Sequence, residues 1–431
     1  TSYPNYEILV VDNGSTEQEA LEYLCALESR ERVRVIRYPH EYNYSAINNY
    51  AARLAGGEYL VLLNNDTVVL RPDWLERMLE HAQRPEIGAV GARLVFADHT
   101  IQHVGVVLGL SGVADHVGYQ EPLAAPGYMG RAQLEQNFSA VTAACLMVGA
   151  DHYWEVGGLD EERFRVLFND VDLCLKLGRA GYRNLLVPRV TLVHHGSASL
   201  SDKKKMEQAW AEIESLWAAW LPKLARDPAY PRNLSLANAG WELETEVDVP
   251  WEPGLPGSPR ILGFGAGSEG ALEHRLRIPL RALDAAGRAE CALVPTRAGR
   301  ARVPAVVELE RSGADVVLLH NAIHDKQLEA LRTYRSFTRT LRVFGQDDLM
   351  LALPEKNPLS KTLYRDIEAR LRRAFSYCDR LVVTTEPLAD AYRDMIGDIR
   401  VIPNYLSRAV WGSLRSERRR GRRPRVGWAG A

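Results

Sequence analysis

Five short motifs place an acid or a histidine directly after a run of apolar residues. They are Val10–Thr16, Leu63–Thr67, Gly157–Asp160, Asn169–Asp172 and His194–Ser199. Ligands of an α/β sheet bind outside the carboxyl ends of its strands. Acids and a histidine at that edge can hold a metal ion, a diphosphate and a general base together. The motifs therefore indicate chemistry on a nucleotide-activated substrate.

Each motif also has an ordinary structural interpretation. Asp12 ends a strand, where it either forms an Asx turn or accepts a hydrogen bond from a nucleotide base. Asp66 is either a turn residue or the carboxylate of a Mg²⁺ or Mn²⁺ site that substrate phosphates complete. Asp170 and Asp172 suit the positive end of a helix dipole, and because residues i and i+2 do not share a helix face, at most one should face a site. His194 is either a structural histidine or a metal ligand.

The elements that position these motifs follow an α/β pattern, in which short apolar runs alternate with amphipathic helices from Glu7 to about Pro222. We expect strands over residues 8–11, 33–38, 59–63 and 185–187, and helices over 46–54, 72–83, 170–179 and 203–221. In the last helix, Trp210, Ile213 and Trp217 have i, i+3, i+7 spacing, which predicts that they pack in the core.

A second α/β pattern follows a stretch rich in proline and glycine between about Asn233 and Pro259, which we interpret as a linker. Its strands are expected over residues 261–264, 291–294, 316–319, 341–344, 381–383 and 401–402. Residues 265–270 match the GxGxxG dinucleotide fingerprint, but the next strand ends without an acid to hold a ribose, so the match is weak. Asp347 and Asp348 are interpreted as turn or cap residues.

Composition narrows the class of protein. A chain of 431 residues is too long for one ordinary core, so we expect two domains. Apolar and charged contents of 46% and 25% are those of a soluble globular protein, and a net charge of −2 argues against a nucleic-acid binder. No apolar stretch reaches the roughly 20 residues of a membrane span. The five cysteines form no CxxC pair, which predicts reduced core thiols in a reducing compartment rather than a zinc site or disulfides.

The two ends of the chain suggest a fragment that is truncated at both ends. It starts at Thr1, shortly before a strand, and residues 426–431 read as a strand that runs into a glycine loop. The seven arginines between Arg415 and Arg425 are interpreted as a solvated linker, with contact to anionic lipid as the alternative.

Several segments, taken together and in order, resemble a family 2 glycosyltransferase of the GT-A fold and of the type that builds bacterial surface polysaccharides. They are residues 43–49, 57–66, 102–106, 140–145, 169–174, 194–199 and 227–230, and the resemblance covers about residues 1–236. Residues 261–280, 347–349 and 401–404 resemble the N-terminal lobe of a GT-B glycosyltransferase similar to family 4.

The resemblance implies a domain organisation. A GT-A domain that lacks its first strand would cover residues 1–235, and a linker would cover 236–258. A Rossmann-like GT-B N-terminal lobe would cover 259–424, and the start of a truncated C-terminal lobe 425–431. Because the missing strand is interior in this fold, residues 8–11 would lose a pairing partner.

The resemblance also implies site roles. Asp170 would be the general base, and Asp66 and His194 would hold Mn²⁺ or Mg²⁺. The nucleotide would be bound by Asp12, Asn13, Asn65 and Asp66. Acceptor-side candidates are Gly158, Asp160, Asn169 and Asp172. The sequence departs from the family at Asn64-Asn65-Asp66, which keeps only the last acid of the DxD metal motif, and at Asn169, where many relatives have Glu.

The implied function is inverting transfer of a sugar from a nucleoside-diphosphate sugar to a saccharide, free or lipid-linked. The product would be a surface polysaccharide such as an O-antigen, a capsule or a rhamnan. We expect a cytoplasmic enzyme, with peripheral contact to the inner membrane and no nucleic-acid partner. One alternative is a degenerate transferase that serves as a scaffold or binding module, which Asn64, Asn65 and Asn169 favour. Another is a polyprenyl-phosphate sugar transferase, which the lack of a visible membrane anchor disfavours.

Overall fold

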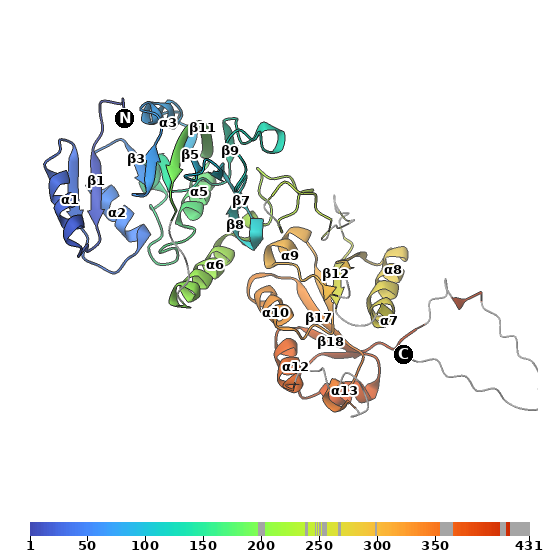
Figure 1. Cartoon of the computed structure of the whole chain (residues 1–431). Coiled ribbons are helices and arrows are strands. Elements are labelled where there is room, and N and C mark those ends of the chain that lie inside the picture. Colours follow the sequence, from blue (N-terminus) through green and yellow to red (C-terminus); the bar gives the residue numbers. More distant parts are fainter. Residues whose placement is uncertain are drawn as a thin grey trace, which may run out of the picture. The chain divides into compact units, whose positions relative to one another are not determined.

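The computed structural model describes residues 1–196, 203–237, 240–245, 247, 249, 251, 257–265, 269–297, 300–353, 365–405 and 411–413. The chain divides into two compact units. Unit 1 comprises Thr1–Asp248, Pro304–Ala314 and Arg332–Arg339, and unit 2 comprises Val249–Val303, Asp315–Leu331 and Thr340–Ala431. Both contain strands and helices, so the predicted α/β class is confirmed (Figure 1).

Unit 1 begins with a two-stranded parallel sheet. Strands β1 (Ile8–Asp12) and β2 (Val33–Arg37) pair along their whole length, and α1 (Gln18–Glu28) connects them. Among the described residues, β1 pairs with β2 alone. Helix α2 (Tyr44–Leu54) follows β2, and the side chain of Asn43 caps it by accepting a hydrogen bond from the Ala46 N–H.

A seven-stranded mixed sheet forms the centre of unit 1, with the order β3-β10-β5-β11-β4 and with β6 and β9 beside β5 and β11. Its strands are β3 (Tyr59–Leu63), β4 (Thr67–Val69), β5 (Ile87–Val95), β6 (Ile101–His103), β9 (Gln136–Phe138), β10 (Cys145–Gly149) and β11 (Arg183–His194). A separate hairpin pairs β7 (Val106–Leu108) with β8 (Ala114–His116). The helices are α3 (Trp74–Ala82), α4 (Ala150–Glu155), α5 (Asn169–Ala180) and α6 (Lys203–Leu224).

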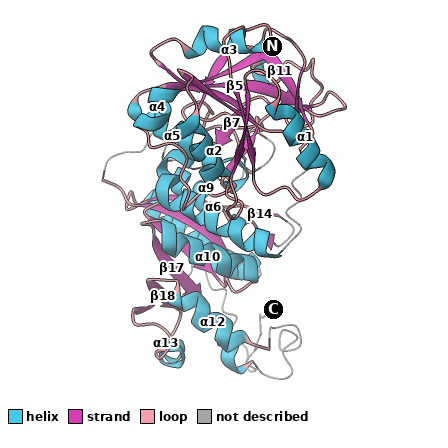
Figure 2. Ribbon diagram, turned by 90° about the vertical axis from the view of Figure 1, so that its left-hand side faces the viewer, coloured by secondary structure: helices cyan, strands magenta, loops and turns pink. Residues whose placement is uncertain are grey.

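The core of unit 1 lies where α3 packs on this sheet, and Met78 of α3 is fully buried there. Helices α4 and α5 lie beside each other and against the strands (Figure 2). A Cβ on Gly91 of β5 would stand 2.5 Å from the Cβ of Val141, so the close approach of these two segments requires glycine.

Two packing predictions need correction. Trp217 in α6 is buried as expected, but Trp210 is 49% exposed, because it lies in the first half of a helix of which only the later turns bury their apolar face. Cys25 is exposed on α1, so not all cysteines are core residues. Cys145 and Cys174 are buried, which raises the pKa of each thiol to about 12.

Unit 2 contains a six-stranded, all-parallel sheet with the order β13-β12-β16-β17-β18-β19. The strands are β12 (Arg260–Gly265), β13 (Glu290–Leu293), β16 (Val316–His320), β17 (Leu341–Gln346), β18 (Arg380–Val383) and β19 (Ile399–Val401). The helices between the strands include α7 (Glu269–Leu272), the π-helix η3 (Glu273–Arg277), α8 (Ile278–Ala285), α10 (Asp325–Phe337), α12 (Ile367–Ser376) and α13 (Glu386–Tyr392). The part of α10 from Arg332 onward belongs to unit 1.

The order of this sheet reverses at β12. The chain moves from β12 outward to β13, and then returns past β12 to β16 and on to β19. Because parallel crossovers are right-handed, the helices that follow β12 and β16 lie on opposite faces of the sheet. Figure 1 shows α7 and α8 on one side of the strands, and α10 and α12 on the other. The carboxyl ends of β12 and β16 therefore form a topological switch point, where doubly wound sheets bind their ligands.

None of the helices in the described ranges combines the length and the apolar composition that a membrane span requires. Several predicted features lie outside the described residues: Ser197–Ser199 of the fifth motif, positions 266–268 of the glycine-rich match, the arginine run and residues 425–431.

Candidate active site

The end of β11 brings His194 beside Asp66, which lies in the turn between β3 and β4. Oδ1 of Asp66 stands 3.1 Å from Nε2 of His194. The Gly196 N–H donates to Oδ2 of Asp66 at 3.1 Å, and the His195 N–H donates to the Asp66 carbonyl at 3.0 Å. The structure thus joins the two residues that were predicted to hold a metal ion.

The tautomer of His194 decides what this pair can bind. Its Nδ1 lies 2.6 Å from Oε1 of Gln102, whose Nε2 donates to the His194 carbonyl at 3.4 Å. Gln102 therefore takes the proton of Nδ1, and a neutral ring has a lone pair on Nε2. That lone pair lies near both the Asp66 carboxylate and Nδ2 of Asn64, so a cation held between His194 and Asp66 would have a ligand atom on each side.

A carboxylate oxygen and an imidazole nitrogen are both ligands of Mn²⁺, and the donor set fits such an ion. Within the described ranges, no group of three or more His, Cys, Asp or Glu side chains gathers that could hold a metal ion. Asp66 and His194 would therefore hold the ion together with water and phosphate oxygens, as often occurs when phosphates complete the coordination.

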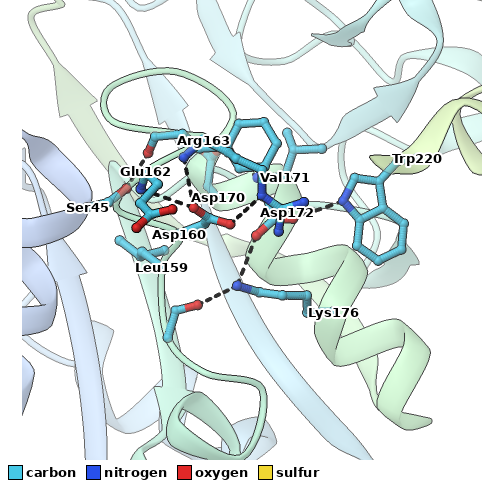
Figure 3. Close-up of polar contacts among 12 residues, drawn as sticks. Ser45, Leu159, Asp160, Glu162, Arg163, Asp170, Val171, Asp172, Lys176 and Trp220 are labelled. Atoms are coloured by element: carbon cyan, nitrogen blue, oxygen red, sulfur yellow. Dashed lines mark hydrogen bonds and ion pairs between the residues drawn. The ribbon is translucent and has the colours of Figure 1, made fainter. Parts of the chain in front are cut away.

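Asp170 lies in the first turn of α5. Its Oδ2 accepts a hydrogen bond from the Ala143 N–H at 3.0 Å, and its Oδ1 accepts one from the Val171 N–H at 2.8 Å. Figure 3 shows this carboxylate at the helix start, beside the loop that carries Asp160. Two backbone hydrogen bonds thus fix the predicted base in position.

Tyr44 connects the metal-side residues with Asp170. Its hydroxyl lies 3.4 Å from Oδ1 of Asn64 and 3.3 Å from the carbonyl oxygen of Ala143. Asn64 in turn places its Nδ2 3.3 Å from Nε2 of His194. Burial, and then the charge of Asp170, raise the pKa of the Tyr44 phenol well above its ordinary value, so the hydroxyl stays neutral. A continuous series of contacts therefore links His194 to Asp170. Tyr44 was not among the predicted site residues, because a tyrosine at a helix start has no distinctive signal.

Asp12 is buried at the end of β1. Its Oδ1 accepts a hydrogen bond from the Ser15 N–H at 2.8 Å, which forms the predicted Asx-type turn, and its Oδ2 lies 2.5 Å from Nη1 of Arg37. The hydrogen bonds from Ser15, and then Arg37, lower the pKa of Asp12. Asn13 donates to the carbonyls of Tyr38 and His40, at 2.8 Å each. These contacts tie the end of β1 to the end of β2.

The structure does not connect every predicted nucleotide-binding residue. Asn65 is exposed in the turn after β3. Among the described residues, no hydrogen bond or ion pair joins Asp12 or Asn13 to Asp66. The nucleotide-binding role of these residues stays a prediction.

The acceptor-side candidates are engaged in contacts of their own. Asp172 is buried, with Oδ1 accepting from Nε1 of Trp220 at 2.9 Å and Oδ2 paired with Nζ of Lys176 at 2.9 Å (Figure 3). Lys176 also donates to the Gly158 carbonyl at 2.6 Å. The carboxylates of Asp170 and Asp172 diverge, as their spacing requires.

The other two candidates also make local contacts. Asn169 is buried and donates from Nδ2 to the Val166 carbonyl at 2.9 Å. Asp160 accepts from the backbone N–H of Arg163 at 2.8 Å and pairs with its guanidinium at 2.7 Å. The acceptor-side roles of all four residues remain predictions.

Polar side chains of α2 hold the loop over residues 157–165. Asn49 is buried and uses both ends of its amide: Nδ2 donates to the Leu159 carbonyl and to Oε1 of Glu161, each at 2.8 Å. Its Oδ1 accepts from the Leu159 N–H at 3.0 Å and the Tyr153 hydroxyl at 2.6 Å. A Cβ on Gly158, which has a φ of +65°, would stand 2.6 Å from this Oδ1. Glycine at position 158 is therefore required for this close approach.

Known proteins share the sequence of the region that carries this site. Residues 1–106 match the model of the family described as "Glycosyl transferase family 2", so the N-terminal region of the chain contains a domain of this family. "Uncharacterized protein y4gI" of Sinorhizobium fredii is 45% identical over 240 residues, which is 55% of this chain and 26% of that protein. "O-antigen biosynthesis protein RfbC" of Myxococcus xanthus is 38% identical over 242 residues, which is 55% of this chain and 18% of that protein. The chain thus spans about a quarter or less of the length of these two relatives.

Other similarities are more distant. "N-acetylglucosaminyl-diphospho-decaprenol L-rhamnosyltransferase" of Mycobacterium tuberculosis is 27% identical over 210 residues, which is 44% of this chain and 67% of that protein. Among solved structures, "Crystal structure of GalNAc-T7 with UDP, GalNAc and Mn2+" aligns with a TM-score of 0.38 and 15% identity, over 51% of this chain and 42% of that one.

Proposed function

We propose that unit 1 is a GT-A glycosyltransferase that moves a sugar from a nucleoside-diphosphate sugar to a saccharide hydroxyl. The observation that carries the proposal is the series of contacts from the Asp66–His194 pair through Asn64, Tyr44 and Ala143 to Asp170. In this proposal the series connects the residues assigned to the diphosphate with the residue assigned as the base, which supports a single active site. The family 2 match over residues 1–106 supports the same assignment.

In this proposal Asp170 accepts the proton of the acceptor hydroxyl as that oxygen attacks the anomeric carbon. The bond to the diphosphate breaks on the opposite side, so the anomeric configuration inverts. A Mn²⁺ or Mg²⁺ ion held by Asp66 and His194 would neutralise charge on the departing diphosphate. Tyr44 keeps Asn64 and the Ala143 segment at a fixed separation, and with them the base.

The remaining roles follow from position. Asp12, Asn13 and Asn65 would bind the nucleotide with Asp66, and the guanidinium of Arg37 adds a cation near Asp12, with a side chain that is 62% exposed. Gly158, Asp160, Asn169 and Asp172 would shape the acceptor side. We assign these roles to residues 1–235, and we retain the GT-B N-terminal lobe as the proposal for residues 259–424.

The acceptor proposed here is a growing surface polysaccharide. One relative is named for O-antigen biosynthesis and another for rhamnosyl transfer to a lipid-linked saccharide, which supports a free or lipid-linked saccharide acceptor. The degenerate scaffold is the second candidate, because Asp66 is the only acid of its motif. The two candidates would share one fold, and only the enzyme would turn over its substrates.

Thermal unfolding of the full chain with UDP, dTDP or GDP, each with Mn²⁺ or with EDTA, tests donor binding. A ligand at a hundred times its dissociation constant adds about 2.7 kcal/mol to the free energy of unfolding, which shifts the midpoint measurably. We expect one nucleotide to stabilise the protein only with Mn²⁺, and Asp66→Asn to abolish the shift. Stabilisation by none of them would contradict the transferase proposal.

Turnover then separates the enzyme from the scaffold. The assay measures release of the nucleoside diphosphate from its sugar donors in the presence of saccharide acceptors. We expect Asp170→Asn to bind the nucleotide normally. Its release of nucleoside diphosphate from the sugar donor should be slower by about a hundredfold or more, because the general base is lost. The control is Asp151→Asn, an exposed aspartate of α4. Tight nucleotide binding by the wild type without turnover would favour the scaffold.

A further inference from the structure

Unit 2 has a polar cluster at the carboxyl ends of its central strands. His320 ends β16 and Asn321 follows it, Gln346 ends β17 and Asp347 follows it, and Arg275 lies in η3 after β12. Arg275, His320 and Asn321 lie at the switch point between β12 and β16, where opposite placement of the helices opens a doubly wound sheet to a ligand. Gln346 and Asp347 lie at the same edge of the sheet, at the end of the adjacent strand β17. The cluster belongs entirely to unit 2 and is separate from the site described above.

The members of this cluster contact one another only in part. Nε2 of His320 lies 3.2 Å from Nδ2 of Asn321 and 3.4 Å from Oδ1 of Asp347, the latter longer than a good hydrogen bond. Burial lowers the pKa of His320, which has no exposed surface, so its ring is neutral. Nη1 of Arg275 donates to the carbonyl of Ile402 at 3.0 Å.

Five buried polar atoms of the cluster have no hydrogen-bond partner among the described residues. They are Nε of Arg275, Nδ1 of His320, Oδ1 of Asn321, Oε1 of Gln346 and Oδ1 of Asp347. Gln346 is completely buried and Asn321 is 9% exposed. Buried polar atoms are nearly always paired in folded proteins, so a concentration of unpaired atoms at one sheet edge indicates a missing common partner.

The backbone around these atoms is also unusual. Asn321 has a φ of +50°, a conformation that costs free energy for any residue other than glycine and that concentrates at functional sites. A Cβ on Gly265 would stand 2.8 Å from the Cβ of His320, and one on Gly345 would stand 3.2 Å from its Nδ1. The neighbouring strands therefore hold His320 and Asn321 in a fixed orientation.

The chemistry of the unpaired atoms defines the ligand. Three are oxygens that accept hydrogen bonds, one is a guanidinium N–H that donates, and Nδ1 of His320 donates or accepts according to the tautomer of the ring. The charges of Asp347 and Arg275 interact and offset each other, so the cluster attracts neither a phosphate nor a divalent cation strongly. Hydroxyl groups, which both donate and accept hydrogen bonds, match these unpaired atoms. A neighbouring cavity lined by Gly265, Leu276 and Pro295 offers an apolar wall for C–H groups.

We propose that this cluster is a second ligand site, which binds adjacent hydroxyl groups of a saccharide. Asp347, Asn321 and Gln346 accept hydrogen bonds from the sugar hydroxyls, and Nε of Arg275 donates to one of their oxygens. The ring of His320 contacts both Asn321 and Asp347 and so orients the two side chains relative to each other.

Saturation-transfer NMR on the full chain tests this site with methyl α-D-glucoside, methyl α-D-mannoside and methyl α-L-rhamnoside. Tetrahydropyran, which has the ring without the hydroxyls, is the negative probe. We expect at least one glycoside to bind, and binding to weaken about tenfold or more in Asp347→Asn and Gln346→Met, as loss of a hydrogen bond to a buried partner implies. Asp348→Asn, a change in the adjacent residue, should bind like the wild type.

Thermal midpoints confirm that each variant is folded. Asn321→Gly is the third cluster variant, because glycine adopts a positive φ without strain and removes only the amide. Equal binding by the wild type and all three cluster variants would place the saccharide in unit 1 and overturn the proposal. Absence of glycoside binding would also overturn it and leave buried water as the partner of the five atoms. Nucleotide binding by unit 1 is measured separately, so failure here does not imply failure there.

Discussion

Nε2 of His194 faces Oδ1 of Asp66 at 3.1 Å while the opposite ring nitrogen is committed to Gln102. This arrangement makes Gln102 the residue that orients the proposed metal ligand. Partners of this kind set the tautomer and the ring position, and their loss weakens metal binding even though they do not touch the ion.

We therefore expect Gln102→Leu to lower the affinity for Mn²⁺ by about 10- to 100-fold, with a smaller effect on folding. Titration of Mn²⁺ followed by electron paramagnetic resonance, with the stabilising nucleotide present, measures the affinity directly. Gln18→Leu, on the exposed surface of α1, is the control. An unchanged Mn²⁺ affinity in Gln102→Leu would mean that His194 is not a ligand or that Gln102 does not orient it.

The loop over residues 157–165 contains two adjacent glycines, and we expect alanine to destabilise the protein by different amounts at the two positions. Both Gly157 and Gly158 have positive φ, but a Cβ on Gly157 meets nothing within 4 Å, whereas one on Gly158 meets Asn49 at 2.6 Å. Gly157→Ala should cost about 1 kcal/mol from backbone strain alone, and Gly158→Ala about 3 kcal/mol because overpacking is added. Urea unfolding of the two variants checks this difference. Equal losses would show that the contact with Asn49 relaxes freely.

Asp172 and Lys176 form a buried ion pair in α5, and we expect their substitutions to change the stability of the protein non-additively. Lys176→Met leaves the Asp172 carboxylate buried without its cation, which should cost about 3–5 kcal/mol. The double variant Asp172→Leu/Lys176→Met removes both charges and should be clearly more stable than Lys176→Met, although Nε1 of Trp220 then lacks its acceptor. Denaturant unfolding of the wild type, both single variants and the double variant measures the coupling. Simple additivity would mean that the pair is already solvated.

The sequence predicted the strands of the second half well because uninterrupted apolar runs are local signals. The six strands expected there are all present within a few residues, and residues 59–63 form β3 as expected. In unit 1 the strand β5 was missed, although it is nine residues long and pairs in parallel with β11. The short antiparallel strands between Ile101 and Phe138 were missed, since a strand of three residues has no periodicity to detect.

For the candidate site, the sequence predicted that an acid and a histidine at strand ends lie close together, but it could not predict side chains that matter through long-range contacts. The proximity of Asp66 and His194 followed from their positions at strand ends. Nothing local marks Tyr44, Arg37 or Gln102, because each matters through a partner that is 20 to 99 residues away. Asn49 makes four hydrogen bonds, yet from the sequence an asparagine within a helix is expected to lie at the surface.

The contacts of Asp12 predict a specific dependence of stability on pH. Its folded-state pKa is lowered by Ser15 and Arg37, whereas in the unfolded chain it returns to the ordinary value of about 3.9. The unfolded state therefore binds the proton first as the pH falls. The stabilisation is complete above that ordinary value and is lost as the pH drops through the lower folded value. Asp12→Asn should thus be less stable than the wild type by about 1 kcal/mol at neutral pH.

This difference should shrink as the pH falls below about 4, because the wild-type carboxylate then becomes protonated as well. Urea unfolding at a series of pH values, each with Asp151→Asn as the control, measures it. Ser15 and Arg37 reach Asp12 from different elements, so Arg37→Met should remove part of the pH dependence and leave the hydrogen bond from the Ser15 N–H. A stability difference that stays constant from neutral pH down to about pH 3 would show that Asp12 acts through its shape and hydrogen bonding rather than its charge. In that case an amide could replace the Asp12 carboxylate in its contact with the nucleotide base. Asp12→Asn would then retain nucleotide binding.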